Sequence, residues 1–254
     1  LRIAENEFSE SSGVIWTSSD RSVVDLAIQE NRFLQHLQYG IHLTASDKTQ
    51  LTTLITGNTC STSAEHTEGL YILTNTDATV THRHHVSKNT YLGHTQAGIH
   101  FVLKGHSLMD LAIADNVIDS NVQEKGIHVE LQEQGHLLNA SIVRNQWKSS
   151  YAIHPEKILL RPRGLSLEFK DTAQAAALSL THNVFSFPVA YGHTSKGCDG
   201  INLTLRNEAH VSHLSCCHNA ISFPASDTAQ QAPIQGIEIA ALHRSILQHA
   251  LITD

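Results

Sequence analysis

The sequence has few charged residues and lacks any long apolar run. Charged residues make up 16% of its 254 positions, against about 25% in a typical soluble protein. The net charge is −7, which argues against a nucleic-acid phosphate backbone as the main partner. No run of about 18 apolar residues occurs, so we expect no membrane span. Ser, Thr, Asn, Gln and His supply the polar surface instead.

Cysteine is scarce, and its four positions do not form the pattern of a disulfide framework. Cys60 and Cys216 occupy apolar positions, where we expect small buried side chains. We expect Cys198 in a loop and Cys217 to point away from Cys216, a spacing that suits metal ligation poorly. No signal peptide is visible and the chain opens on Leu1 in mid-repeat, so we expect a segment of a longer protein.

An asparagine recurs every 25 to 38 residues, and a period in this range indicates stacked structural units. An apolar or sulfur-containing side chain stands three residues before each one, and an apolar, aromatic or sulfur-containing side chain stands two residues after it. Asparagine tolerates left-handed backbone angles at a tight bend, and stacked amides can bond to one another. We therefore predict an asparagine ladder formed by Asn6, Asn31, Asn58, Asn89, Asn116, Asn145, Asn183 and Asn219.

Each repeat also contains a glycine followed by alternating apolar residues, at Gly13, Gly40, Gly69, Gly98, Gly126, Gly164, Gly200 and Gly236. Alternation with period two predicts a strand with one buried face and does not fit a helix. A second short strand, such as residues 24–28 or 111–113, ends near the asparagine, and a third follows it. We predict an all-β, single-stranded, right-handed parallel β-helix of about eight coils, forming one domain over residues 1–254. We also expect further coils or caps in the parent chain.

The segment Tyr39-Gly-Ile-His-Leu43, followed by Leu54-Ile-Thr-Gly-Asn58, resembles the pectate-lyase-like β-helix repeat of carbohydrate-binding proteins and sugar hydrolases. It is closest to the NosD-like form of that repeat. The resemblance implies the fold but no single activity, because enzymes, adhesins and scaffolds share it. It also implies that the glycine-led sheet carries the active groove of any enzyme, and NosD-like proteins are linked to copper delivery.

The outward positions of the glycine-led strands carry the candidate catalytic residues. Glu130 and Glu168 lie on neighbouring strands, about 4.8 Å apart, which is close to the carboxylate spacing of a retaining glycosidase. Two stacked like charges would raise one pKa, which suits a general acid. Lys170, Arg206 and His128 complete this candidate set. The alternative is a surface ladder of opposite charges with little energetic weight.

Long links between an asparagine and the next glycine mark a candidate binding surface in the C-terminal half. Extra residues in a solenoid go to loops on one side, which is often the binding face. The candidate binding residues are Tyr151, His154, Arg161, Arg163, Tyr191, His193 and Lys196. The alternative is that these links are solvated insertions.

The sequence leaves three functions open. We expect a non-catalytic stalk or binding segment of a larger bacterial secreted or surface protein, such as an adhesin, with carbohydrate or a surface receptor as partner. One alternative is a polysaccharide lyase, epimerase or glycoside hydrolase. The other is a NosD-like copper-handling protein, for which His100 and His128 on adjacent strands are the metal candidates. Because the 19 histidines are dispersed along the chain, we expect no cofactor.

Overall fold

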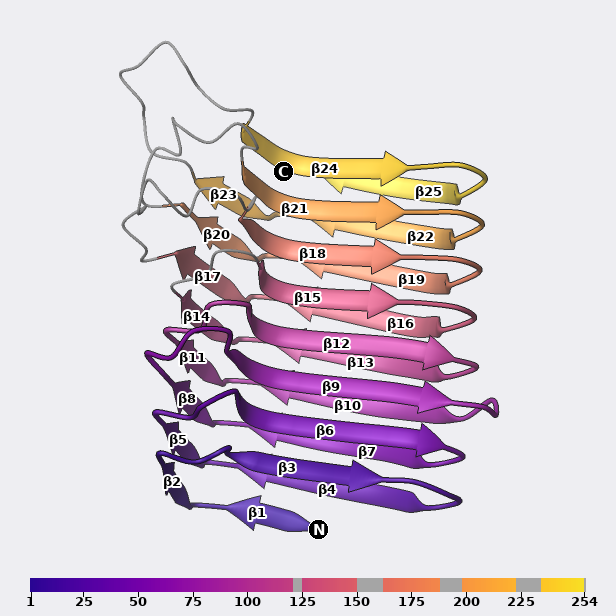
Figure 1. Ribbon diagram of the computed structural model, residues 1–254. Coiled ribbons are helices and arrows are strands. Elements are labelled where there is room, and N and C mark those ends of the chain that lie inside the picture. The colour runs from indigo at the N-terminus through magenta and orange to yellow at the C-terminus, as the bar shows by residue number, and fades with distance from the viewer. Residues whose placement is uncertain (121–124, 150–161, 188–197, 223–233, 254) are drawn as a thin grey trace.

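The computed structural model describes residues 1–120, 125–149, 162–187, 198–222 and 234–253. Within these residues the chain forms three parallel sheets of nine, eight and eight strands and no helix, so none of them belongs to a helix able to cross a membrane. Neighbouring strands in each sheet come from successive turns of the chain (Figure 1). The predicted single-stranded, right-handed parallel β-helix is therefore confirmed.

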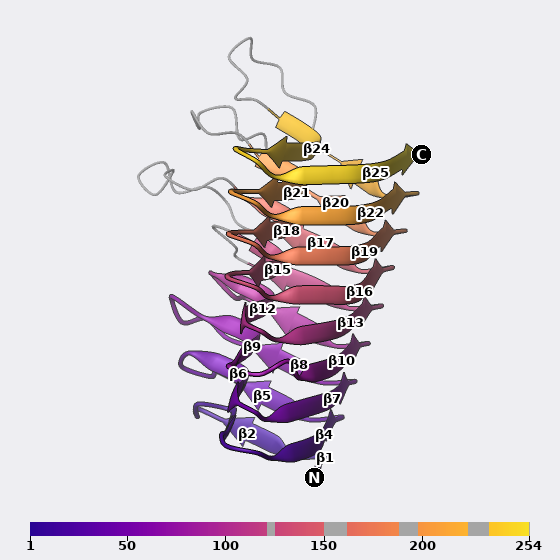
Figure 2. The same ribbon diagram turned by 90° about the vertical axis from the view of Figure 1, so that its right-hand side faces the viewer.

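Each turn of the chain is here called a coil, and a full coil places one strand in each sheet. Sheet A contains β1 (Arg2–Ala4), β4 (Val23–Gln29), β7 (Gln50–Thr56), β10 (Thr81–Ser87), β13 (Leu108–Ala114), β16 (His136–Val143), β19 (Gln174–Thr181), β22 (His210–Cys217) and β25 (Ile246–Thr253). Sheet B contains β2 (Glu7–Ser9), β5 (Arg32–Leu34), β8 (Thr59–Ser61), β11 (Thr90–Leu92), β14 (Val117–Ser120), β17 (Gln146–Ser149), β20 (Val184–Ser186) and β23 (Ala220–Ser222). Sheet C contains β3 (Val14–Ser18), β6 (Tyr39–Asp47), β9 (Glu68–Thr76), β12 (Ala97–Gly105), β15 (Lys125–Leu131), β18 (Arg163–Phe169), β21 (Cys198–Leu205) and β24 (Ile234–Ala241). Figure 2 shows the same stack from the side, with β1 at one end and β24 and β25 at the other.

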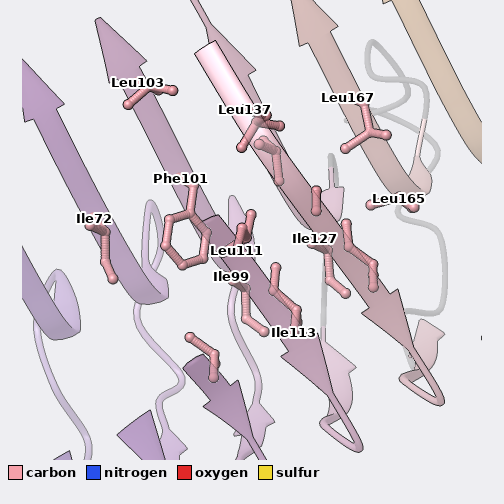
Figure 3. Close-up of a cluster of buried hydrophobic side chains, with 14 of the residues drawn as sticks. Ile72, Ile99, Phe101, Leu103, Leu111, Ile113, Ile127, Leu137, Leu165 and Leu167 are labelled. Carbon is pink, nitrogen blue, oxygen red and sulfur yellow. The ribbon is translucent and has the colours of Figure 1, made fainter. Parts of the chain in front are cut away.

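The core lies between the sheets, where side chains of alternate residues meet. Ile99 and Phe101 on β12 lie near Leu111 and Ile113 on β13, and all four side chains are buried (Figure 3). Ile127 on β15 pairs in register with Ile99 and continues its column into the next coil. Burial of these apolar columns supplies the main driving force for folding, and the buried face predicted for the glycine-led strands is confirmed.

The glycine at the start of a sheet C strand leaves room for the side chain two residues after the asparagine of the same coil. A Cβ atom at Gly126 would lie 2.3 Å from Cδ1 of Trp147. A Cβ atom at Gly164 would lie 2.2 Å from Cδ1 of Phe185. Both distances are far shorter than carbon–carbon van der Waals contact. The glycine and the large side chain two residues after the asparagine therefore depend on each other, because the side chain fills the space that the glycine leaves.

The predicted asparagine ladder is confirmed, and its central members are buried. Asn89 donates from Nδ2 to Oδ1 of Asn116 at 3.0 Å, and Asn116 donates in the same way to Asn145 at 2.9 Å. Asn116 Nδ2 also donates to the backbone oxygens of Val86 and Ala114. The backbone N–H of Asn89 donates to Oδ1 of Asn116. Each amide thus joins the backbone of two coils.

The expectation that asparagine itself adopts left-handed angles is wrong. The left-handed residue is the one before each asparagine, and at seven of the eight positions it is not glycine: Glu5, Glu30, Gly57, Lys88, Asp115, Arg144, His182 and His218, with φ between 53° and 69°. The asparagine follows the bend rather than forming it, because its side chain must point into the stack to bond to its neighbours. The side chain before it is free to vary.

The cysteine positions match the sequence prediction in part. Cys60 and Cys216 lie in the hydrophobic core as expected, and burial raises the pKa of the Cys60 thiol. Cys198 is not in a loop, because it is the first residue of β21. The strand begins there since β21 and β24 pair from Cys198 and Ile234 onward.

Among the described residues, four histidines are buried inside the coils, where solvent cannot stabilise their charged form. His36 and His94 stack with ring centroids 5.0 Å apart, and neither ring nitrogen of His36 has a hydrogen-bond partner in the described part of the chain. His82 and His84 occupy inward positions of β10. Burial lowers the pKa of His36 and of His82 to about 4, and that of His94 and of His84 to about 3.

Replacing a central ladder residue should destabilise the fold strongly. We expect Asn116→Ala to lower the free energy of unfolding by about 3 kcal/mol, because buried donors and acceptors in neighbouring coils lose their partners. Asn139→Ala is the control, since Asn139 is exposed and its side chain bonds, among the described residues, to the half-buried Asp110. It should change stability by less than about 0.5 kcal/mol. Chemical denaturation measures both. Equal losses in the two variants would contradict this role of the ladder.

The buried histidines should make the protein sensitive to acid. Their folded pKa values lie below the ordinary value of 6.5, so the unfolded chain takes up protons that the folded chain does not. Stability is therefore complete above about pH 6.5 and falls as pH drops toward about 4, by about 1.4 kcal/mol per pH unit for each histidine. His36→Leu removes one of these protonation sites, so it should lessen the slope of unfolding free energy against pH by about 1.4 kcal/mol per pH unit. His85→Leu, at an exposed position, should leave the slope of denaturation free energy against pH unchanged.

Candidate metal centre

A row of five aromatic and imidazole rings crosses the outer face of sheet C. The ring centroids of Tyr39 and His42 are 4.5 Å apart, and those of His42 and Tyr71 are 5.0 Å apart. Tyr71 lies 5.1 Å from His100, and His100 lies 4.6 Å from His128. These side chains face outward because the residues before and after His42, Tyr71, His100 and His128 belong to the inward columns. The in-register stack thus brings together residues from four coils.

His100 is held in one tautomer by a carboxylate. Its Nδ1 lies 2.7 Å from Oε1 of Glu68, and the two side chains are 16% and 9% exposed. Because a carboxylate accepts hydrogen bonds, Nδ1 carries the proton in this contact. Nε2 of His100 is buried and has no hydrogen-bond partner among the described residues. The imidazole therefore keeps an unused lone pair.

His128 is oriented in the same way by a backbone carbonyl. Its Nδ1 donates to the oxygen of Ser166 at 3.2 Å, so its Nε2 also carries a lone pair. That nitrogen accepts a hydrogen bond from Nζ of Lys125 at 3.0 Å. Burial lowers the pKa of His128 and outweighs the effect of the nearby Glu130, which keeps the imidazole neutral at neutral pH.

His100, His128 and Glu130 form a set of potential metal ligands. One donor atom from each lies within 4.8 Å of the other two, and this is the only group of its kind found among the described residues. Histidine ligands in metal sites usually donate their second N–H to a carboxylate or a backbone carbonyl, as both histidines do here. Two imidazole nitrogens with one carboxylate suit Cu²⁺ or Zn²⁺. The residues present therefore fit a transition-metal ion.

Residues 1–185 match the sequence profile of a family described as periplasmic copper-binding protein (NosD). The chain belongs to the NosD family. Searches of curated proteins and of solved structures found no match. The region matched to the NosD family includes Glu68, His100, His128 and Glu130, so the whole ligand set lies inside it. The resemblance noted in the sequence is thus confirmed.

Two carboxylates of this NosD-family chain lie in a network of ion pairs, Glu130 of the ligand set and Glu168 beside it. Glu130 and Glu168 are neighbours in register, as predicted. Glu130 accepts hydrogen bonds from Lys170 and Gln132. An oxygen of Glu168 lies 3.5 Å from Nζ of Lys125 and the other lies 3.6 Å from Nζ of Lys170. Every carboxylate of the pair therefore faces at least one ammonium group.

Neither carboxyl group of this pair has the raised pKa that we expected of a general acid. The neighbouring His128, together with hydrogen bonds from Lys170 and Gln132, lowers the pKa of Glu130 well below its ordinary value. Burial alone would raise the pKa of Glu168, but Lys125 and the other nearby cations outweigh burial and lower it. The expectation of a raised pKa is wrong, because cations stand between the two carboxylates and remove their repulsion.

The other predicted site residues divide between this network and positions away from it. Arg163 joins the network, with its guanidinium 3.4 Å from Glu168 and 3.5 Å from the buried Asp199. Arg206 follows β21 and is exposed, and no ion pair within the described ranges connects it to Glu168. The remaining binding candidates lie outside the described residues: Tyr151, His154, Arg161, Tyr191, His193 and Lys196.

The sequence interpretation missed Glu68 and Lys125, which orient or contact the two histidines. Each stands directly before the glycine of its strand, as Arg163 and Asp199 also do, and these four positions stack in register with Ala97 between Glu68 and Lys125. The signal was present in the sequence, because the position before glycine is polar or charged in most coils.

Removing Lys170 should raise the pKa of Glu130. Lys170→Met deletes a hydrogen bond and a positive charge beside that carboxylate, so the carboxylate should become easier to protonate. Titration of the side-chain carboxyl carbon by NMR measures the change. Lys104→Met is the control on the same sheet, because Lys104 is not among the groups that shift Glu130. An unchanged titration in Lys170→Met would contradict the proposed charge network.

Proposed function

We propose that this chain is a periplasmic β-helix protein that binds a copper ion through His100, His128 and Glu130. The observation that carries the proposal is the arrangement of the two imidazoles. In each ring Nδ1 donates to an oxygen acceptor, and Nε2 carries the lone pair that can bind a metal ion. The family description, which names both the periplasm and copper, supports it independently. It also agrees with the expectation of a protein outside the cytoplasm.

Each residue around the ion has a separate role in this proposal. His100 and His128 supply nitrogen ligands, and Glu130 supplies an oxygen ligand whose negative charge is maintained by its lowered pKa. Glu68 fixes the orientation of His100 from behind. A divalent copper ion binds nitrogen and oxygen ligands more tightly than the other divalent ions of its row, so copper should be preferred over zinc.

The alternative of a polysaccharide-active enzyme has weaker support. A glycosidase needs one carboxyl group that holds a proton for the leaving group, and the pKa values of Glu130 and Glu168 are both lowered. Binding of carbohydrate or a surface receptor by the long C-terminal links stays a prediction. A screen for turnover of acidic polysaccharides tests the enzyme alternative.

Copper titration should show one saturable site that depends on both histidines. We expect His100→Ala and His128→Ala each to weaken Cu²⁺ binding by at least about tenfold, and Glu68→Gln to weaken it by about tenfold through the orientation of His100. Isothermal titration calorimetry measures each affinity, with competition against Zn²⁺. His85→Ala, at an exposed histidine on sheet A, is the matched control. Absence of saturable heat, or equal losses in His85→Ala and His100→Ala, would rule out this site.

A further inference from the structure

Lys125 lies between His128, which is one of the candidate ligands, and the carboxylate of Glu168. Its Nζ is 3.0 Å from Nε2 of His128 and 3.5 Å from Oε1 of Glu168. Lys125 opens β15, three residues before His128, and its side chain is 21% exposed. It is therefore confined between two acceptors rather than extended into solvent.

The lone pair that Lys125 uses on His128 is the same one that a metal ion would need. Nδ1 of His128 is committed to the oxygen of Ser166, so the imidazole offers only Nε2. An ammonium N–H and a metal ion cannot both take that lone pair, and two cations at such short range also repel each other. An ion can bind His128 only after the ammonium group has left.

Glu168 gives the displaced ammonium group a second partner. The contact between Lys125 and Glu168 already exists at 3.5 Å, and a lysine has a flexible four-carbon stem with three donors on its ammonium group. Arg163 and Lys170 also approach Glu168, but a carboxylate has about four lone-pair sites. Rotation of the lysine side chain alone is enough to exchange His128 for Glu168.

We propose that Lys125 is a built-in competitor for the metal site, an inference that rests on the proposed copper binding. Its ammonium group occupies Nε2 of His128 when no ion is bound and passes to Glu168 when an ion arrives. Lys125 therefore weakens metal binding, and Glu168 strengthens it by holding Lys125 away. Lys125 and Glu168 together should make the site selective, because only a strongly coordinating ion can displace the lysine from His128.

A double-mutant cycle on metal affinity tests this role. Lys125→Met removes the ammonium group and keeps the length of the side chain, and should tighten Cu²⁺ binding by about tenfold, the equivalent of one charge-assisted hydrogen bond. Glu168→Gln should weaken binding several-fold in the wild-type background, where Lys125 loses its alternative partner. In the Lys125→Met background the same change should have almost no effect, since the two residues act through each other.

The controls separate competition from general electrostatics and from misfolding. Lys104→Met and Glu133→Gln remove one positive and one negative charge at the half-buried Lys104 and the exposed Glu133. They should change the Cu²⁺ affinity less than Lys125→Met and Glu168→Gln do. Thermal unfolding establishes that each variant is folded, and Lys125→Gln serves as a second neutral variant. Calorimetry with Cu²⁺ alone, repeated with Zn²⁺, supplies the affinities.

Each outcome distinguishes the two proposals. Tighter binding by Lys125→Met than by Lys104→Met, with no effect of Glu168→Gln in that background, supports the competitor role. Copper binding by Lys125→Met alone, with none by the wild type, also supports it. If the wild type binds copper and Lys125→Met binds equally or more weakly, the competitor role is overturned while the copper site stands. If no folded variant binds copper, both proposals fail.

Discussion

The register between coils depends on a row of buried amides. An asparagine side chain in this stack bonds to the amide of the next coil and to backbone oxygens of its own and the preceding coil. A buried amide without partners is costly, so a coil shifted by one residue would lose these bonds and turn its apolar side chains outward. The amide bonds of the asparagines therefore keep the stacked side chains of all three sheets aligned from coil to coil.

The site on sheet C is a consequence of that alignment. Glu68, His100, His128 and Glu130 are spread over three coils, and their contacts exist only because β9, β12 and β15 pair without a shift. Lys170 and Glu168 add a fourth coil through β18. No single segment of the chain contains the site, so its geometry is as firm as the pairing of the strands beneath it.

The sequence was sufficient to predict the fold but not the chemistry of the site. Alternation along the glycine-led strands and the spacing of the asparagines determine which residues are buried, and these predictions are confirmed. Glu68 and Lys125 were missed because the alternation of side chains is interrupted at the glycine. A Cβ atom on that glycine would point inward, and the side chain of the next residue also points inward. The position before the glycine then faces outward, although counting by two places it inside.

Electrostatics were less accessible than register. The sequence placed Lys170 beside the stacked Glu130 and Glu168. It did not show that the ammonium group contacts both carboxylates, because a long flexible side chain can reach several neighbours. The sign of the pKa shift follows from that contact. The left-handed residue was misplaced by one position for a related reason, since spacing identifies a bend without showing which residue forms it.

The asparagine row also gives the stack a polarity. In all seven successive pairs from Asn6 to Asn219, the amide nitrogen of the earlier coil donates to the amide oxygen of the later one. Bonds that point the same way polarise one another. The row therefore has a direction, because each amide nitrogen points toward the later coil and each amide oxygen accepts from the earlier one. A coil that ran in the opposite direction would bring together two donors or two acceptors, so the row accepts coils of one orientation only.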